Sequence, residues 1–329
     1  MNTVLVTGTA GFIAHRVTRL LLEQGVEVVG IDNLNDAYDL RLKQHRLADL
    51  AGREGFTFYE GDIENLYDLK PVFDGRQFDV IFNLAARAGV RYSIENPHVY
   101  MQSNAQGALN LLEMMRPGDC RKFILASTSS LYAGQPMPFR EDLPVDRPLS
   151  PYAASKKAAE VLTYTYHHLY GIDVSILRYF TVYGPAGRPD MAPFRFIKWI
   201  HEGTPITVFG DGSQTRDFTY VDDIACGTIL AARAMGNHGV PEHEIINLGG
   251  GKTPISLLEF IGKIEDRLGK KAEIVWQPMS ASEMQDTSAD ISKAARLLGW
   301  QPETDLDAGL DATVEWYLDN VKWAGEVRL

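Results

Sequence analysis

The sequence predicts an α/β fold built on a doubly wound parallel sheet, with a smaller α/β domain interleaved in its second half. Three observations in the 329 residues point to this fold. Short β-branched runs alternate with amphipathic stretches up to about residue 180. A glycine-containing turn joins the first strand to the first helix. Beyond about residue 180 the alternation of strands and helices gives way to segments rich in glycine and proline.

Six short runs of apolar and β-branched residues predict strands in the first half of the chain. These runs are 3–7, 26–31, 56–59, 78–84, 122–127 and 173–179. Amphipathic stretches between them predict helices over 12–24, 66–73, 99–115 and 151–170. Because short strands joined by helices form right-handed crossovers, we expect a parallel sheet covered on both faces.

The second half of the chain predicts less regular structure. Segments 184–193 and 209–216 have the composition of turn-rich loops. The apolar run 245–248, just before three glycines, predicts a strand that returns near the main sheet. A helix over 256–268, a strand over 272–276 and C-terminal helices are expected to follow.

Composition and charge exclude several classes of protein. Hydrophobic residues make up 45% and charged residues 23% of the chain, which excludes disordered, collagen-like and coiled-coil proteins. There are 43 acidic and 32 basic residues, so the net charge is −11 and a nucleic-acid partner is not expected.

The sequence also bears on the compartment. Two cysteines, Cys120 and Cys226, fit a reducing environment better than a disulfide framework. The first residues show no cationic leader with a cleavage site. No apolar run reaches the roughly 18 residues of a membrane span. We therefore expect a cytoplasmic protein with no membrane partner.

The turn after the first strand predicts a dinucleotide site. Gly8, Gly11 and Ala14 follow the strand in a Gly-x-x-Gly-x-x-Ala pattern that leads into a helix. Gly8 permits a tight turn, Gly11 lets the backbone approach a pyrophosphate, and Ala14 allows close packing of helix on strand. The helix N-terminus offers free N–H groups to the anion.

An acidic residue at the end of the second predicted strand supports this reading. Asp32 can accept hydrogen bonds from both hydroxyls of the adenosine ribose and would repel a 2′-phosphate, so we expect NAD rather than NADP. Asn33 follows it, with no arginine to hold a phosphate. Asp62, after the third strand, lies near the adenine or, alternatively, caps a helix before Glu64.

These features predict two domains. Residues 1–180, with a return segment near 217–250, are expected to form a Rossmann-like NAD-binding domain. Residues 181–329 are expected to form a smaller domain that faces the substrate. The break in the strand–helix alternation is the basis for the division.

Tyr152 and Lys156 predict a proton-transfer site. They stand at i and i+4 at the start of a predicted helix, so the ammonium can lie near the phenol, although the same spacing also fits an ordinary solvated pair. Thr128 ends the preceding strand, at the edge of the sheet where ligands bind. A free phenol has a pKa of about 10, and making it a base at neutral pH takes about 4 kcal/mol. A neighbouring ammonium and an oxidised nicotinamide can supply this stabilisation.

Longer segments resemble a known family over essentially the whole chain. TGTAGFIA (7–14), ID (31–32), GDI (61–63), NLAA (83–86), STSS (127–130), YAASK (152–156) and RDFTYVDDI (216–224) resemble the extended short-chain dehydrogenase/reductases. Within that family, IDNLNDAYD (31–39), RAGVRYSIENPHVY (87–100), RYFTVYGPAGRPDM (178–191) and ADISKA (289–294) are similar to UDP-glucuronate 4-epimerases.

The resemblance implies a reaction and a cofactor. It implies interconversion of UDP-glucuronate and UDP-galacturonate at C4, through a transient 4-keto sugar and a tightly held NAD. Tyr152 would act as the acid/base, Lys156 would hold the nicotinamide ribose and lower the phenol pKa, and Thr128 would assist. The keto sugar would turn about its diphosphate before hydride returns to the opposite face.

The resemblance also implies the binding residues. Those for the cofactor are Gly8, Gly11, Phe12, Ile13, Asp32, Asn33, Asp62, Ile63, Leu84, Ala85, Ala86, Asn104, Tyr152, Lys156 and Tyr179. Those for the substrate are Arg87, Ser129, Ser130, Thr181, Arg188, Arg216 and Glu283.

Within the substrate set, Arg188 is our candidate for the sugar carboxylate, because a guanidinium offers two parallel donors. Arg87, with Arg91, would add positive charge beside an acidic sugar. Arg216 would hold the diphosphate and Glu283 the nucleotide ribose. The alternatives are an ordinary loop arginine for Arg188 and surface ion pairs for Arg216 and Glu283.

Other activities fit parts of the same pattern. A UDP-glucose/UDP-galactose 4-epimerase shares the proton-transfer residues, but the arginine-containing segments favour an acidic sugar. A UDP-glucuronate decarboxylase or a nucleotide-sugar 4,6-dehydratase carries an acidic residue in the stretch that corresponds to 129–132, where this chain has none. A non-catalytic NAD-binding regulator would not need Tyr152, Lys156 and Thr128 together.

Two further expectations concern metals and assembly. The eight histidines predict no metal site, because His167 and His168 are adjacent and no cysteine or acidic cluster completes a ligand set. By resemblance, we expect a homodimer through the helices predicted over 99–115 and 151–170.

Overall fold

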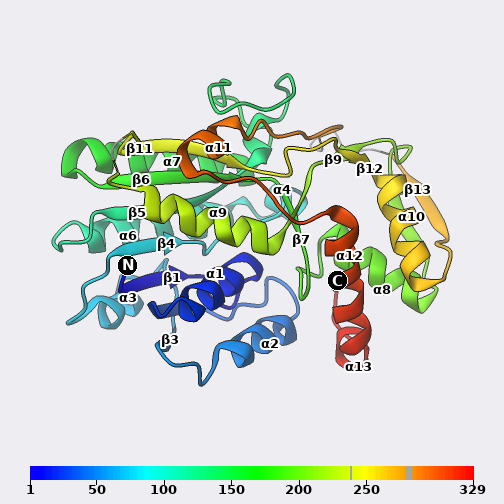
Figure 1. Cartoon of the computed structure of the whole chain (residues 1–329), viewed down its shortest axis with the longest axis horizontal. Helices are drawn as coiled ribbons and strands as arrows, with labels where there is room; N and C mark the ends of the chain where they lie inside the picture. The colour runs from blue at the N-terminus through cyan, green and yellow to red at the C-terminus, as the bar shows by residue number, and fades with distance from the viewer. Residues whose placement is uncertain (238, 279–283) are drawn as a thin grey trace.

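The computed structural model describes residues 1–237, 239–278 and 284–329, and its centre is a seven-stranded sheet (Figure 1). In spatial order the strands are β11 (His243–Leu248), β6 (Asp173–Tyr179), β5 (Lys122–Thr128), β4 (Val80–Asn83), β1 (Thr3–Thr7), β2 (Glu27–Asp32) and β3 (Phe56–Glu60). All six pairings in this sheet are parallel. The order reverses between β1 and β4, which confirms the doubly wound α/β fold.

Helices cover both faces of the sheet. One face carries α1 (Phe12–Glu23), α9 (Val221–Ala234) and α11 (Ser292–Leu298), and the other carries α3 (Leu66–Phe73), α6 (Gly107–Met115) and α7 (Pro151–Tyr170). In β1, Val4 and Val6 belong to the core of the first face and Leu5 to that of the second, all fully buried. A strand buried on both sides explains why the strand sequences are nearly continuous apolar runs.

Most elements of the first half lie where the sequence predicts them. The six predicted strands are present, and the predicted ranges 26–31 and 78–84 correspond to β2 and β4. The returning strand is confirmed, since β11 pairs in parallel with β6 at the edge of the main sheet. The predicted helix over 256–268 is α10 (Leu257–Leu268), and the strand over 272–276 is β13 (Ile274–Gln277).

One predicted helix is wrong as a single element. The range 99–115 covers the end of α5 (Pro97–Tyr100), a π-helical segment η1 (Met101–Gln106) and α6. A π-helical insertion shifts the side chains that follow it, and such insertions gather at functional sites. Here the segment carries Asn104, whose buried side chain bonds the backbone of Arg87 beside the cavity described below.

The sequence pattern missed α2 (Leu40–Leu50), which follows β2. Its buried residues are Leu42, Lys43, Arg46 and Leu50, so half of its inward face is cationic. A helix whose buried face carries two charges lacks the continuous apolar stripe by which an amphipathic helix is recognised.

Beyond β6 the chain builds what we call the small lobe, which comprises α8 (Ala192–Glu202), α10, α12 (Leu306–Asp319), α13 (Val321–Ala324) and the parallel pair β8 (Ile206–Phe209) and β13. It lies at one end of the sheet, on the right in Figure 1. Its core includes Phe194, Phe260 and Tyr317, and also Leu42 of α2. The helix α2 therefore packs against both parts of the molecule.

Short elements connect the two parts. They are α4 (Val90–Glu95), η2 (Ser129–Tyr132), β7 (Thr181–Tyr183) paired with β10 (Phe218–Tyr220), and β9 (Thr215–Arg216) paired with β12 (Ile255–Ser256). The division into domains at 1–180 and 181–329, with a return near 217–250, stays a prediction. Among the described residues, no helix is long and apolar enough to cross a membrane.

Candidate active site

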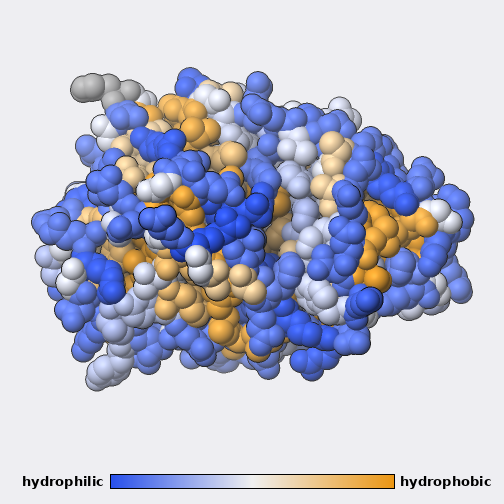
Figure 2. All heavy atoms as spheres, turned by 60° about the horizontal axis from the view of Figure 1, so that its bottom comes forward, coloured by the Kyte–Doolittle hydropathy of each residue, from blue (hydrophilic) through white to orange (hydrophobic). Residues whose placement is uncertain are grey.

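A cavity of about 1310 Å³ opens at the carboxyl edge of the sheet, beside the small lobe. Figure 2 shows a hollow between the larger part of the molecule and the smaller one. The sequence-predicted residues that line this cavity are Gly8, Gly11, Phe12, Ile13, Asp32, Asn33, Asp62, Ile63, Leu84, Ala85, Ala86, Arg87, Thr128, Ser129, Ser130, Tyr152, Lys156, Tyr179, Thr181, Arg188 and Arg216. The carboxyl ends of the strands thus bring segments from across the chain to one site.

Two predicted residues stand apart from this set. Asn104 does not line the cavity, because its amide donates to the carbonyl of Arg87 and to Ser155 Oγ, at 2.9 and 2.8 Å. It supports the Arg87 backbone from behind. Glu283 lies outside the described residues.

The loop after β1 is shaped to receive a pyrophosphate. Gly8 has a φ of +71°, and a Cβ placed on it would lie 2.7 Å from the Cα of Ala85. A Cβ on Gly11 would lie 2.7 Å from the carbonyl oxygen of Gly8. Gly11 is the N-cap of α1 and provides no side-chain cap, so the first N–H groups of the helix remain available to an anion. These glycines fit a bound dinucleotide.

The end of β2 carries a buried carboxylate at the same cavity. Asp32 accepts hydrogen bonds from the N–H of Ala10 at 3.1 Å and of Leu34 at 2.9 Å. Lys43 of α2, which the sequence reading missed, donates to Asp32 at 3.2 Å and to Asn35 at 3.0 Å. The carboxylate is therefore fixed in an orientation suited to a ribose diol, and Lys43 lies beside it in the cavity wall.

Asp62 lies at the end of β3. Its carboxylate accepts from Asn33 Nδ2 at 2.8 Å and from the N–H of Glu64 at 2.9 Å. The helix that follows is capped by Asn65, so Asp62 closes a turn and is not the N-cap of α3. The link between Asp62 and Asn33 ties the ends of two neighbouring strands at the cavity.

The proton-transfer residues meet where β5 ends and α7 begins. Thr128 is the last residue of β5, and Tyr152 is the second residue of α7, whose N-cap Ser150 accepts from the N–H of Ala153 at 3.2 Å. A hydrogen bond joins the hydroxyls of Thr128 and Tyr152. One turn further, Lys156 is buried and donates to the carbonyl of Ala126 at 2.9 Å.

Burial controls the protonation of this group. It raises the pKa of the Tyr152 phenol, while the Thr128 hydrogen bond and the charge of Arg188 act in the opposite direction. Burial also lowers the pKa of Lys156 to about 8, against the opposing charge of Glu160. The chain alone therefore does not make Tyr152 basic at neutral pH, and further positive charge beside the phenol would be needed.

A buried polar network lies behind the N-terminal half of α7. Glu160 accepts two hydrogen bonds from Arg178, at 2.9 and 2.8 Å, and one from Ser127 at 2.7 Å. Arg178 also donates to the hydroxyl of Tyr132 at 2.8 Å, and Tyr132 donates to Asn247 of β11 at 2.8 Å. These bonds link α7 to β5 and β6 next to Thr128 and Lys156.

The loop between β7 and α8 brings Arg188 to the other side of the cavity. Its guanidinium is bound to Asp190 through Nε at 3.0 Å and Nη2 at 2.5 Å, and Nη2 also donates to the carbonyl of Ala88 at 3.2 Å. Burial opposes its charge, but Asp190 outweighs this and raises the pKa of Arg188. An incoming carboxylate would approach through Nη1 or displace Asp190.

The remaining predicted substrate residues line the same cavity. Ser129 and Ser130 begin η2, and the N–H of Ser130 donates to Thr128 Oγ1 at 3.1 Å. Thr181 opens β7. Arg216 donates to the carbonyls of Thr215 and Gln285, at 2.8 and 3.0 Å.

Positive charge gathers on the lobe side of the cavity. Arg87 lies over the ring of Tyr92 at 5.2 Å, and Arg91 lies over the ring of Phe209 at 3.9 Å. Arg195 of α8, which the sequence reading missed, has its pKa lowered by burial and by the charge of Arg91. Like charges held together in this way favour an anionic ligand. No sequence motif pointed to Arg195, because it lies within an amphipathic helix that carries other charged residues.

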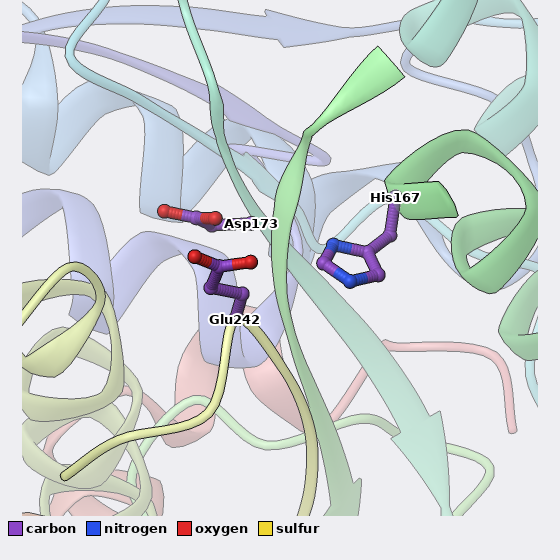
Figure 3. Close-up of side chains that lie close together, drawn as sticks. All are labelled: His167, Asp173 and Glu242. Carbon is purple, nitrogen blue, oxygen red and sulfur yellow. The ribbon is translucent and has the colours of Figure 1, made fainter. Parts of the chain in front are cut away.

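A separate group of ligand-type side chains lies away from the cavity, at the amino end of β6. His167, Asp173 and Glu242 each place one such atom within 4.8 Å of the others (Figure 3). The sequence reading did not anticipate that two carboxylates lie beside His167. However, Glu242 is exposed, and exposed acidic groups commonly lie together without an ion, so we assign no ion to this group.

Comparison with known proteins agrees with this geometry. A UDP-glucuronate 4-epimerase of Thermodesulfobacterium geofontis is 55% identical over all 329 residues and covers 100% of both chains. The Bacillus cereus UDP-glucuronic acid 4-epimerase, solved with UDP-glucuronic acid and NAD, is 39% identical with a TM-score of 0.89, over 97% of this chain and 99% of that one. A Thermotoga maritima UDP-glucose 4-epimerase with UDP-glucose has 30% identity and a TM-score of 0.86, over 97% and 99%. The model of the NAD dependent epimerase/dehydratase family matches residues 4–249, and the chain belongs to that family.

Proposed function

We propose that this chain is an NAD-dependent UDP-glucuronate 4-epimerase that interconverts UDP-glucuronate and UDP-galacturonate. The observation that carries the proposal is the meeting of a Thr128–Tyr152–Lys156 group and the Arg188 loop in one cavity. The first can move the proton of a sugar hydroxyl, and the second offers a guanidinium to a sugar acid. The 55% identity to a UDP-glucuronate 4-epimerase over the whole chain supports it.

Different residues of the chain would bind the cofactor and transfer the proton. NAD, when bound, would take a hydride from C4 and return it to the opposite face. Gly8 and Gly11 would receive its pyrophosphate and Asp32 its adenosine ribose. Tyr152 would take the proton of the 4-hydroxyl at its phenolic oxygen, helped by the hydrogen bond of Thr128, and give it back after the sugar has turned.

An acidic sugar fits the lobe side of the cavity better than a neutral one. Arg87, Arg91, Arg188 and Arg195 all line this cavity. A ketone at C4 lies β to the C5 carboxylate, and such acids lose CO₂ readily. A guanidinium that holds the carboxylate in the plane of the ring would resist that loss. The stretch that forms η2, Ser129–Tyr132, contains no carboxylate that could assist chemistry at C5.

The outer face of α7 supports a homodimer as part of this proposal. Val161, Tyr164 and Leu169 are exposed by 54%, 59% and 59%, and lie on the same helix that carries Tyr152. A second copy of the chain is the occupant we propose for this face.

Both cysteines are free thiols, which supports a reducing, cytoplasmic compartment.

The purified chain with UDP-glucuronate as its only sugar tests the proposal. We expect UDP-galacturonate, detected by chromatography against standards, with no consumption of added reductant. With deuterium at C4 of the substrate, the label should remain in the product. UDP-xylose as the main product would indicate the decarboxylase. No product here, together with turnover of UDP-glucose in a parallel assay, would indicate the neutral 4-epimerase. Loss of the deuterium to solvent would contradict the redox mechanism.

A further inference from the structure

Arg46 of α2 is completely buried and lies between the dinucleotide loop and the loop that carries Arg188. Its Nε and Nη2 donate to the carbonyl oxygen of Ala186 at 3.1 and 2.7 Å, and Nη2 also donates to that of Gly187 at 3.3 Å. Its Nη1 donates to the carbonyl of Ala10 at 3.0 Å and to the hydroxyl of Tyr38 at 2.7 Å. One side chain thus joins backbone atoms about 175 residues apart in sequence.

The backbone that Arg46 holds is under strain. Ala186 has a φ of +53°, a left-handed conformation that is unfavourable for a residue with a Cβ. Only Gly187 separates it from Arg188. A relaxation of Ala186 toward ordinary angles would swing the Arg188 backbone and move its guanidinium away from Asp190 and Ala88.

The charge of Arg46 needs an explanation beyond packing. Its hydrogen bonds go to uncharged oxygens, and its guanidinium lies over the rings of Phe12 and Tyr38 at 5.9 and 5.5 Å. Within the described residues, no carboxylate forms an ion pair with it. An apolar side chain of similar length could fill the same space without the desolvation of a charge. What it could not do is hold three carbonyl oxygens on two loops at once.

We infer that Arg46 is a positioning residue that sets the place of Arg188 relative to the cofactor loop, and thereby the selection of an acidic sugar. The inference rests on the proposed function, because it assigns Arg188 to the sugar carboxylate. Arg46 touches neither ligand in this scheme and acts only through the backbone of the two loops. The planar guanidinium, with its several N–H donors, holds the two loops in place, and the charge is not what is required.

Binding measurements in a Tyr152→Phe background test the inference without consuming the substrate. Calorimetry would compare UDP-glucuronate with UDP, which lacks the sugar acid, for chains with and without Arg46→Lys. We expect Arg46→Lys to weaken UDP-glucuronate about tenfold, because the fork is lost, while the affinity for UDP is unchanged. Adding Ala186→Gly, which accepts the left-handed conformation without strain, should restore part of the loss.

The matched control is Arg53→Lys, since Arg53 bonds only the side chain and carbonyl of Asp49, on the same segment but outside the cavity wall. In an Arg188→Ala background, Arg46→Lys should add no further loss. Equal weakening of UDP and UDP-glucuronate, or additive effects of the two arginine changes, would overturn the inference. A wild-type chain that fails to convert UDP-glucuronate would instead refute the proposed function.

Discussion

The two sides of the cavity are built in different ways. Thr128, Tyr152 and Lys156 stand at the end of a strand and the start of a helix, where regular hydrogen bonding and the Glu160–Arg178 pair hold them. Arg188 stands on an irregular loop held by isolated contacts from Arg46. In the proposed function, the reaction chemistry thus depends on secondary structure, whereas recognition of the sugar acid depends on a few buried polar contacts. Substitutions at Tyr152 should therefore affect the chemical step, whereas substitutions at Arg188 should affect substrate binding.

Removing the phenolic hydroxyl should have the largest effect, and only on chemistry. Tyr152→Phe keeps the ring that packs at 6.0 Å from Tyr100, so folding and NAD binding should survive. We expect kcat to fall by about 10³ or more, because the acid/base is lost. The measurement is product formation from UDP-glucuronate, with bound NAD quantified in the same sample. Activity near that of the wild type would remove Tyr152 from the mechanism.

A change on the other side should act on binding instead. Arg188→Ala should raise the KM for UDP-glucuronate roughly 30-fold, because a charged hydrogen-bond partner is lost. We also expect some UDP-xylose, since the carboxylate of the keto sugar is then less restrained. Steady-state kinetics with product analysis would detect both effects.

The counterpart of that change is Asp190→Asn, which keeps the shape of the partner but removes its charge. If Asp190 competes with the substrate carboxylate, this variant should lower the KM by a few-fold. Unchanged KM and product distribution in both variants would show that Arg188 does not meet the sugar acid.

The last expected effect concerns folding stability and not catalysis, and it sharpens the contrast between the two cations. Burial lowers the pKa of Lys156 to about 8 from an ordinary value of 10.5, whereas Asp190 raises that of Arg188. Between about pH 8 and pH 10.5 the unfolded chain binds more protons at Lys156 than the folded chain. The free energy of unfolding of the wild type therefore increases as the pH rises through this range.

Below pH 8 the buried ammonium therefore costs folding free energy. Lys156→Met should stabilise the chain at pH 7 by about 2 kcal/mol, and this gain should shrink toward pH 10.5. Thermal unfolding across this range would measure it, with Lys157→Met as a half-exposed neighbour for comparison. A gain independent of pH would show that burial does not shift the pKa of Lys156.

How far the sequence alone leads depends on how local the signal is. The strands and the Tyr152–Lys156 spacing are set by residues close in the chain, and each lies where the sequence predicts it. The helix α2 was missed because Lys43 and Arg46 interrupt its buried face, and their partners Asp32 and Ala186 lie elsewhere in the sequence. Such cations are intelligible only once the tertiary contacts are known.

The side of the cavity that carries Arg188 shows the same limit of prediction from sequence. Arg188 could be singled out within GPAGRPDM, but neither its pairing with Asp190 nor the left-handed Ala186 follows from the letters. Arg195 reached the cavity wall from a helix that carried no recognisable motif. The π-helical segment that holds Asn104 likewise looks like ordinary helix in sequence, because it contains no proline or glycine to interrupt the helix.

The late arrival of β11 has a consequence for biosynthesis. Its residues, 243–248, leave the ribosome long after β6, so a nascent chain exposes β6 as an open parallel edge until about three-quarters of translation is complete. Asn247, which secures Tyr132, arrives with it. Premature termination before this strand would leave a polypeptide that contains nearly all the predicted cofactor-binding residues but exposes the unpaired, aggregation-prone edge of β6.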